Sequence, residues 1–398
     1  MKYVKRRIIK MLDFKALAEK NHDYVVEMRR YFHAHPELSR QEVNTSKKIC
    51  EELDKMGVPY EAYEDYSVIA TLDSGKPGKT VLIRGDIDAL PVEEATGLEY
   101  SSQTPGVMHA CGHDCHGAML LGIAKSLSEN LDGFEGKILL GFQVAEENLR
   151  GSRPMVQYVK DLGGADHAIA VHVNATENLG EMKIFAGPFA SGVITYKIFI
   201  NGRGGHGSRP HASIDPIKPA CELVLKLASI PSNMVDAQDP IVFSTCQISG
   251  GSAPNIIPDQ AFIFGTVRYY NKALTNQIKE WLENISDCVA KSYGCTREVE
   301  YTFDPMIPVD NDVAATNIGI KVAEEMGLKI TAPEKGMGSD DMALLLDAFP
   351  GFYCNLGGAN ESKGIGHVAN HNACFTVDED CLKLGTEFLM KSAYELLK

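Results

Sequence analysis

The amino-acid sequence predicts an α/β protein, in which a larger domain with a mixed, mostly parallel sheet is interrupted by a smaller inserted α+β domain. Up to about residue 183, helical patterns alternate with short apolar runs, as in strands joined by helical crossovers. From Ser191 the order of elements changes, and the first pattern returns after residue 302. We therefore assign residues 1–183 and 303–398 to the larger domain and residues 184–302 to the insert.

The elements of the larger domain follow from the spacing of its apolar residues. Before the insert, helices are expected in FKALAEKNHDYVVEMRRYFHAH, QEVNTSKKICEELDKMG and HGAMLLGIAKSLSENL, the last starting near Gly117. Strands are expected in KTVLIRGDID, GKILLGFQVAEE and DHAIAVHV. After the insert, helices DVAATNIGIKVAEEMG and DEDCLKLGTEFLMKSAYELL surround the strand GFYCNLGG.

The insert has a different order. Strand GVITYKIFING is followed by helix DPIKPACELVLKLASI, strands PIVFSTCQISG and QAFIFGTVRYYN, helix NQIKEWLENISDCVAKSYG and strand REVEYTF. This β-α-β-β-α-β order predicts a ferredoxin-like unit.

Composition narrows the function classes. The chain has 398 residues and a formal net charge of −14, with 44% hydrophobic residues. No dense basic face is available to release counterions from phosphates, which argues against a nucleic-acid partner and favours a small-molecule substrate. The basic start MKYVKRRIIKMLDF lacks the apolar run of a secretory signal, and no segment approaches the ~18 apolar residues of a membrane span. We expect a cytoplasmic protein without a membrane partner.

The ten cysteines do not suggest a disulfide framework. Most lie in apolar periodic segments, and we predict that Cys50, Cys221, Cys246 and Cys288 are small buried hydrophobic residues.

Metal-binding residue types gather after the predicted strands, where ligands bind at the carboxyl edge of an open α/β sheet. Asp86 and Asp88 follow VLIR, Glu146 and Glu147 follow ILLGFQVA, and His172 follows AIAV. The segment MHACGHDCHGAMLLG precedes a helix, and the loop after GFYCNLGG carries His367 and His371. Five separate segments thus deliver such residues to one edge of one sheet.

Two other uses of Cys111 and Cys115 fail on spacing. A zinc finger needs a second Cys/His pair within the usual ~12 to 20 residues, and none follows Cys115. A thioredoxin-like pair needs Cys-x-x-Cys, whereas these cysteines are four positions apart. The pair Glu146 and Glu147 suits a hydrolase, because neighbours leaving a strand point to opposite sides. One carboxylate could then bind metal while the other faces the activated water.

The segment Gly202 to Gly207 matches G-x-G-x-x-G after a strand. The sequence SRPHASIDP delays the next helix, which argues against a dinucleotide site. We interpret the glycines as a flexible connection that carries His206.

The motifs resemble, in order and from about residue 27 to 380, a family of metal-dependent amidohydrolases. They are RRYFHAHPELSRQE, RGDIDALP, MHACGHDCHGAMLLG, FQVAEE, GRGGHGSRPH, APNIIPD, GTVR and HNACFTVDE. The family includes hippurate hydrolase, N-acyl-amino-acid deacetylases and auxin-conjugate hydrolases, relatives of aminoacylase and glutamate carboxypeptidase. The resemblance implies a catalytic domain with two metals and an inserted ferredoxin-like lid that also mediates dimers, so that a homodimer or higher homo-oligomer is expected.

Carried over by position, the resemblance implies that two divalent metal ions are bound by Cys111, His113, Glu147, His172 and His371. Thiolate, imidazole and carboxylate donors suit zinc or manganese, and the sulfur argues against magnesium or calcium.

The resemblance also implies roles in the reaction. Glu146 is the expected general base, and His206 is expected to stabilise the oxyanion from the lid of a partner subunit. Asn255 and Arg268 are expected to hold the substrate, and Asp88 to orient a ligand histidine. Five further histidines are expected to be structural or to support the ligands: His33, His109, His116, His211 and His367.

Three stretches depart from the family pattern and leave the substrate open: NLRGSRPMVQYV after the glutamates, Ser339-Asp340-Asp341 where Glu-Asp is common, and Asn-Ala instead of Ser-Pro after His371. The predicted reaction is hydrolysis of the amide bond of an N-acyl amino acid or similar conjugate. A dipeptidase or carboxypeptidase with the same metal site, or a metal-binding subunit without catalysis, are the alternatives.

Overall fold

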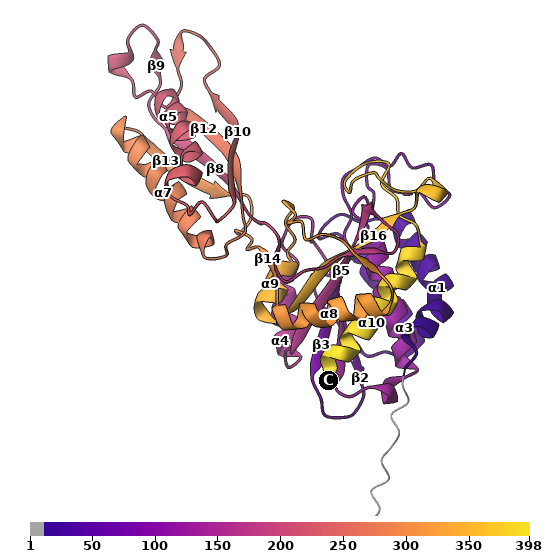
Figure 1. Cartoon of the computed structure of the whole chain (residues 1–398). Coiled ribbons are helices and arrows are strands. Elements are labelled where there is room, and N and C mark those ends of the chain that lie inside the picture. Colours follow the sequence, from indigo (N-terminus) through magenta and orange to yellow (C-terminus); the bar gives the residue numbers. More distant parts are fainter. Residues whose placement is uncertain (1–11) are drawn as a thin grey trace, which may run out of the picture. The chain divides into compact units, whose positions relative to one another are not determined.

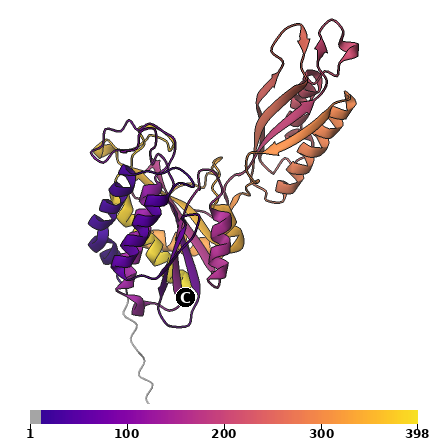
Figure 2. The same cartoon turned by 180° about the vertical axis from the view of Figure 1, so that it is seen from behind.

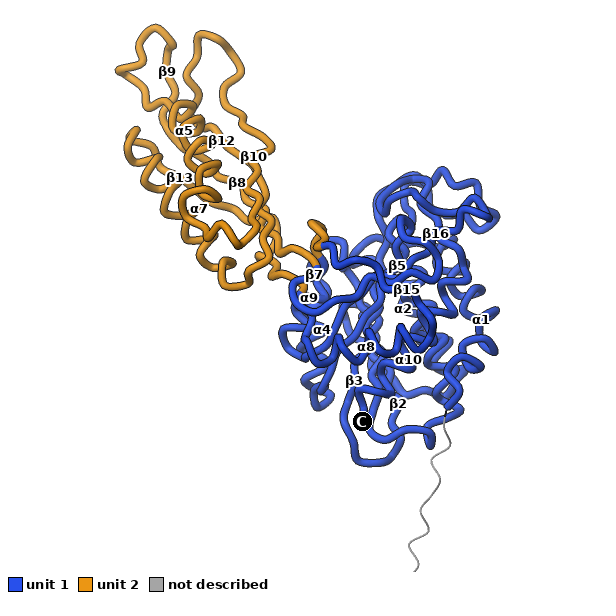
Figure 3. The backbone as a smooth tube through the Cα atoms, viewed as in Figure 1, with its two compact units in different colours: residues 1–189, 310–334, 340–398 blue, residues 190–309, 335–339 orange. Residues whose placement is uncertain are grey.

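The computed structural model describes residues 12–398 and divides them into two compact units (Figure 3). Unit 1 comprises residues 12–189, 310–334 and 340–398, and unit 2 comprises residues 190–309 and 335–339. The main segment of unit 2 runs from Ala190 to Val309, whereas the sequence pattern predicted an insert at 184–302. Unit 2 also includes Lys335–Ser339. The basic segment 1–11, on which the argument against a secretory signal rests, lies outside the described residues.

Unit 1 is built on an eight-stranded mixed sheet with the order β1-β2-β4-β3-β5-β16-β6-β15 (Figure 1). The central neighbours β4-β3, β3-β5 and β5-β16 are parallel, whereas β1-β2 and β2-β4 are antiparallel. This confirms the predicted α/β class with a mixed sheet. The strands are β1 (Tyr60–Ala62), β2 (Val68–Asp73), β3 (Thr80–Asp86), β4 (Lys137–Gln143), β5 (His167–Asn178), β6 (Glu181–Lys183), β15 (Lys329–Ile330) and β16 (Gly351–Ala359). A short pair, β7 (Gly187–Ala190) and β14 (Val309–Asn311), lies outside this sheet.

Helices cover the unit 1 sheet. Helices α1 and α3 lie side by side (Figures 1 and 2), α3 and α10 pack on β3, and α9 packs on β5 and β16. The core between these layers is apolar, with side chains such as Ile83, Leu140 and Ile169 fully buried. The helices are α1 (Phe14–Ala34), α2 (Val43–Met56), α3 (His113–Ser128), α4 (Ser152–Asp161), α8 (Val313–Glu325), α9 (Met342–Ala348) and α10 (Asp380–Leu397), with short 3₁₀ turns at Leu131–Gly133 and Glu361–Lys363.

Unit 2 has its own sheet and core. Its antiparallel strands lie in the order β10-β12-β8-β13, and α5 and α7 pack on the sheet through buried residues such as Ile198, Leu223 and Ile278. The main elements follow the predicted order: β8 (Gly192–Asn201), α5 (Ile217–Ala228), β10 (Ile241–Gly250), β12 (Gln260–Tyr269), α7 (Leu274–Ser292) and β13 (Thr296–Tyr301). Three short elements, β9 (Gly205–His206), α6 (Ile230–Asn233) and β11 (Ile256–Ile257), and a 3₁₀ turn at Pro210–Ala212 complete it.

Two predicted element boundaries were wrong. Helix α3 begins at His113 rather than near Gly117, because the preceding Gly112 adopts a left-handed φ of 89° that turns the chain into the helix. His172 does not follow its strand but lies inside β5, which continues to Asn178 because it pairs with β16.

The prediction that Cys50, Cys221, Cys246 and Cys288 are buried was wrong. Cys221, Cys246 and Cys288 are exposed and Cys50 is half-buried. Cys221, Cys246 and Cys288 lie in unit 2, on sides of α5, β10 and α7 that do not face its core. No described helix is long and apolar enough to cross a membrane.

Candidate metal centre

Gly112 separates the first two predicted ligands, and no other residue fits there. Its φ is left-handed, and a Cβ atom at this position would lie 2.3 Å from Cγ2 of Val173. The chain can therefore reverse direction between Cys111 and His113 and place both side chains beside β5.

The structure brings all five predicted ligands together. Ligand atoms of Cys111, His113 and His172 lie within 4.8 Å of one another, and so do those of Cys111, Glu147 and His371. The Cys111 Sγ to His172 Nε2 distance is 3.4 Å, and the Glu147 Oε2 to His371 Nε2 distance is 3.5 Å. Such separations suit two donors that each lie about 2.0 to 2.3 Å from one ion.

The imidazoles of His113 and His172 both present Nε2 to the metal centre. His113 Nδ1 lies 3.0 Å from the backbone oxygen of Asp88 and 3.1 Å from Asp88 Oδ1, two acceptors that place the hydrogen on Nδ1. His172 Nδ1 donates to the backbone oxygen of Val173 at 2.8 Å. By accepting from His113 Nδ1, Asp88 orients a predicted ligand histidine, as expected from the sequence.

Two buried atoms at the centre lack a hydrogen-bond partner: His113 Nε2 and Glu147 Oε1, which lie 3.9 Å apart. Buried polar atoms are almost always paired in folded proteins. A divalent ion would satisfy both atoms, so the donor set fits a metal.

The electrostatics of the centre also fit a cation. Burial raises the pKa of Glu147 to about 7, and burial together with Asp340 and Glu147 raises the pKa of Glu146 well above its ordinary value. Burial also raises the pKa of the Cys111 thiol. Burial is the largest influence on His113 and would lower its pKa, but Asp86, Cys111 and Asp88 together more than offset it, so the pKa is raised. A bound divalent ion would stabilise the ionised carboxylates and the thiolate, and would therefore lower the pKa values that burial raises.

Glu146 and Glu147 diverge in a turn rather than from an extended strand. The carboxylate of Glu146 groups with Asp340 and Asp341, whereas that of Glu147 groups with Cys111 and His371. Both still lie within reach of His113, since His113 Nε2 is 4.0 Å from Glu146 Oε2.

Arg84, which sequence reasoning missed, organises the acidic side of the centre. Its guanidinium lies 2.5 Å from Asp86, 2.9 Å from Asp341 and 3.5 Å from Asp340, and it is almost fully buried. Asp341 also accepts from the amides of Gly151 and Ser152 at the start of α4. The motif RGDIDALP contains this arginine and Asp86, but the partners Asp340 and Asp341 are distant in sequence.

Hydrogen bonds engage both ring nitrogens of His116. Its Nδ1 hydrogen bonds to Asp86, and its Nε2 accepts from the backbone N–H of Val173 at 3.0 Å. Both ring nitrogens are therefore occupied, although His116 groups with Asp86 and His113.

The other histidines play no direct part in this centre. His33 bonds to Asp114 and Glu94 in a buried network with Arg29, and His109 is buried beside that network. His367 lies 3.3 Å from the exposed Glu361. His211, in unit 2, is exposed.

The predicted residues of unit 2 do not all meet. His206 on β9 pairs with Ile256 on β11, and the backbone oxygen of Asn255 accepts from Gly207, so His206 and Asn255 are neighbours at one end of the sheet. Both are exposed. Arg268 lies near the other end of β12, opposite Val193.

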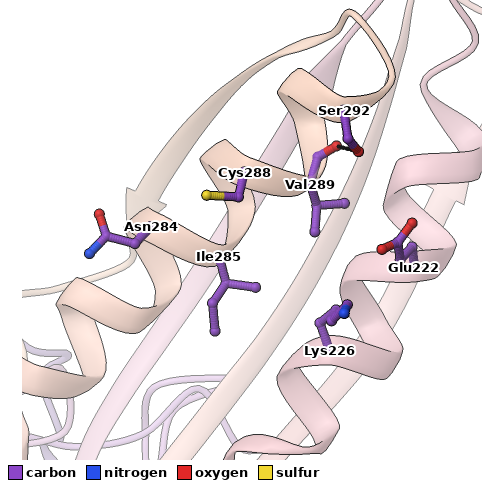
Figure 4. A pocket seen from close by; sticks show the side chains of 7 residues that line it. All are labelled: Glu222, Lys226, Asn284, Ile285, Cys288, Val289 and Ser292. Carbon is purple, nitrogen blue, oxygen red and sulfur yellow. Dashed lines mark hydrogen bonds between the residues drawn. The ribbon is translucent and has the colours of Figure 1, made fainter.

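Unit 2 also has a hollow between α5 and α7 (Figure 4). Its volume is about 400 Å³ and it is lined by Glu222, Lys226, Asn284, Ile285, Cys288, Val289 and Ser292. It contains none of the predicted site residues.

The comparisons with known proteins agree with this geometry. The chain is 38% identical to thermostable carboxypeptidase 1 of Saccharolobus solfataricus, over 91% of this chain and 93% of the relative. It is 32% identical to N-acetylcysteine deacetylase of Bacillus subtilis, over 95% and 98%. The solved structure of the Bacillus subtilis YXEP protein, described as a dinuclear metal binding peptidase, matches with a TM-score of 0.81 and 30% identity, over 95% of this chain and 99% of that one. The model of peptidase family M20/M25/M40 matches residues 82–395, which confirms the resemblance seen in the motifs, and the chain belongs to this family.

Proposed function

We propose that this hydrolase of amide bonds cleaves N-acyl amino acids or similar small conjugates into a carboxylic acid and an amino acid. One observation carries the proposal: five donors converge from four segments, with two orphaned ligand atoms among them and a sixth group, Glu146, beside them. Relatives named for N-acetylcysteine and N-acyl-L-amino acids support this substrate class.

The metals proposed are two divalent transition ions, zinc or manganese. Cys111, His113, Glu147, His172 and His371 would hold them. A thiolate can bridge two ions, and Cys111 belongs to both ligand groups. When bound, the ions acidify water and polarise the substrate carbonyl.

Glu146 is proposed as the general base. It would accept a proton from the attacking water and later deliver it to the leaving nitrogen, so that one water is consumed for each amide cleaved. Its burial and its acidic neighbours Asp340 and Asp341 keep it ready to hold that proton.

The unit 2 residues are proposed to act across a homodimer. Arg268 lies eight positions beyond Gln260 along the extended strand β12, a span of about 27 Å, and β9 and β11 lie next to Gln260. One small substrate cannot touch both Arg268 and His206 of the same unit. We therefore propose that Arg268 and His206 of one chain serve different substrate molecules: Arg268 would bind a substrate carboxylate, and His206 with Asn255 would act in the site of the partner subunit.

His206 has the tautomer that an oxyanion donor needs. Its Nδ1 accepts from the backbone N–H of Ser208 at 3.1 Å, which leaves the hydrogen on the exposed Nε2. This supports the predicted role of His206.

The surface of unit 2 supports the proposed homodimer. Among the described residues, most exposed large apolar side chains lie in this unit: Ile217, Leu225, Met234, Val242, Ile248, Ile256, Tyr293 and Met337. Val242 and Ile248 among them lie on β10, an edge strand of the unit 2 sheet, and an exposed strand edge offers a pairing surface for a second copy.

The proposed location is the cytoplasm. A thiolate ligand must stay reduced, and none of the ten cysteines forms a disulfide.

The relatives named carboxypeptidase leave a peptidase as the second candidate. We would assay the purified protein with N-acetyl and N-benzoyl amino acids and with dipeptides, each under added zinc, manganese and cobalt. Turnover confined to acylated substrates supports the proposal. Preference for dipeptides would favour the peptidase, and no turnover in metal-replete protein would favour a binding subunit.

A further inference from the structure

Asn370 directly precedes His371 in the loop between β16 and α10, and its side-chain amide reaches the centre. Its Nδ2 lies 3.1 Å from the backbone oxygen of Cys111, 3.6 Å from Cys111 Sγ and 3.5 Å from the backbone oxygen of Val173. All three are acceptors. The NH₂ group must therefore face them, because the amide oxygen would repel them.

These contacts join three predicted ligands. Cys111 is one of them, His371 is the next residue along the chain, and Val173 follows His172. The backbone oxygen of Val173 also accepts from His172 Nδ1, which sets the orientation of that ring. One amide thus adjoins segments that are far apart in sequence.

The loop needs such an anchor. His371 has a left-handed φ of 69°, which is unfavourable for a residue with a side chain. Its backbone N–H donates to the backbone oxygen of Ala110 at 2.7 Å. This bond and those of Asn370 fix the loop at neighbouring residues of the Cys111 segment.

We propose that Asn370 is a positioning residue for the metal centre: it donates a hydrogen bond to the Cys111 thiolate and ties the His371 loop to the Cys111 and His172 segments. This rests on the proposed function, in which Cys111, His172 and His371 bind the metals. A neutral N–H donor suits the thiolate, because it stabilises negative charge on sulfur without competing for the ligand.

The test compares Asn370→Leu, which keeps the branched shape and removes the donor, with Asn372→Ala on the same loop. Asn372 is exposed and its Oδ1 accepts from the amide of Cys374. Each protein is loaded with cobalt, and two quantities are measured: the sulfur-to-cobalt charge-transfer absorption and the rate of cobalt transfer to a chelator. Thermal unfolding of the metal-free proteins is measured in parallel.

For Asn370→Leu we expect a shifted charge-transfer band and release that is about 10-fold or more faster, the usual effect of losing a residue that supports a ligand. Asn372→Ala should keep the wild-type band and rate. If Asn370→Leu lowers only the unfolding temperature, with an unchanged band and release rate, Asn370 is merely structural and the inference is wrong. A wild-type protein that binds no cobalt through Cys111 would instead overturn the proposed function.

Discussion

The two units present their candidate functional residues in opposite ways. In unit 1 the ligand group is mostly buried, and its histidines are held by Asp88 and Val173. In unit 2, His206 and Asn255 are exposed, and the hydrogen bonds of His206 go to its neighbour Ser208. The arrangement in unit 1 is preformed by contacts within that unit. In unit 2, Nε2 of His206 is left exposed and available to a group outside this unit. Under the proposed function, the chemistry resides in unit 1, and His206 acts in the site of a partner chain.

The sharpest test of unit 1 separates base from ligand. Glu146→Gln keeps the size of the side chain, and we expect it to retain metal while kcat falls by about 10²- to 10⁴-fold, because the water loses its proton acceptor. Glu147→Gln should instead lower the metal content measured by elemental analysis. If Glu146→Gln loses metal and Glu147→Gln retains it, Glu146 is the ligand and Glu147 the base.

The test of unit 2 uses mixed dimers. His206→Ala should lower kcat by about 10²- to 10³-fold with metal content unchanged, since only the oxyanion donor is lost. Mixing it in equal amounts with Glu146→Gln should restore about a quarter of wild-type activity, because half of the dimers are hybrids and each has one intact shared site. If hybrid dimers form but stay inactive, His206 does not act in the site of the partner subunit.

A smaller effect separates the two cysteines of the CGHDCH segment. Cys111→Ala should lose at least one metal ion per chain. Cys115→Ala should retain both, since Cys115 is fully buried in the apolar core and lies outside the ligand groups. Equal metal content in the two variants would remove Cys111 from the ligand set.

The smallest effect concerns the buried network behind the centre. Burial opposes the ionisation of Glu94, but hydrogen bonds from His33, Thr96 and the Ser102 amide more than offset it and lower its pKa to about 2. The ionised carboxylate therefore contributes stability above its unfolded-state pKa of 4.5, and this contribution is lost as pH falls towards 2. Glu94→Gln should lower the unfolding temperature by a few degrees (about 2 to 4 °C) at pH 7. The difference from wild type should narrow between pH 4.5 and 2, and a constant difference would contradict the assignment.

Sequence reasoning succeeded where the information was local. The sheet follows from apolar runs, and the five proposed donors could be named because each stands in or beside a short motif shared with the family. It failed where tertiary contacts decide. Nothing near Arg84 indicates Asp340 or Asp341 as partners, and His116 bonds to a strand that lies elsewhere in the sequence. The exposed cysteines of unit 2 were misjudged because apolar periodicity does not show where the buried side of an element ends. Helix α4 was missed, although Pro154 in its first turn and the apolar pair Met155 and Val159 were usable signals.

The parallel pairing of β5 and β16 means that the sheet of unit 1 can be completed only after unit 2 has been synthesised. Asn355 lies opposite His172, and all of Ala190–Val309 is synthesised between these strands. Because contacts between such distant segments form late in folding, a chain emerging from the ribosome can fold α3 and much of unit 2 before the last donor, His371, exists. Under the proposed ligand set, metal uptake by the complete centre belongs to the final stage of maturation, and a chain interrupted before residue 371 would lack one of the five proposed ligands.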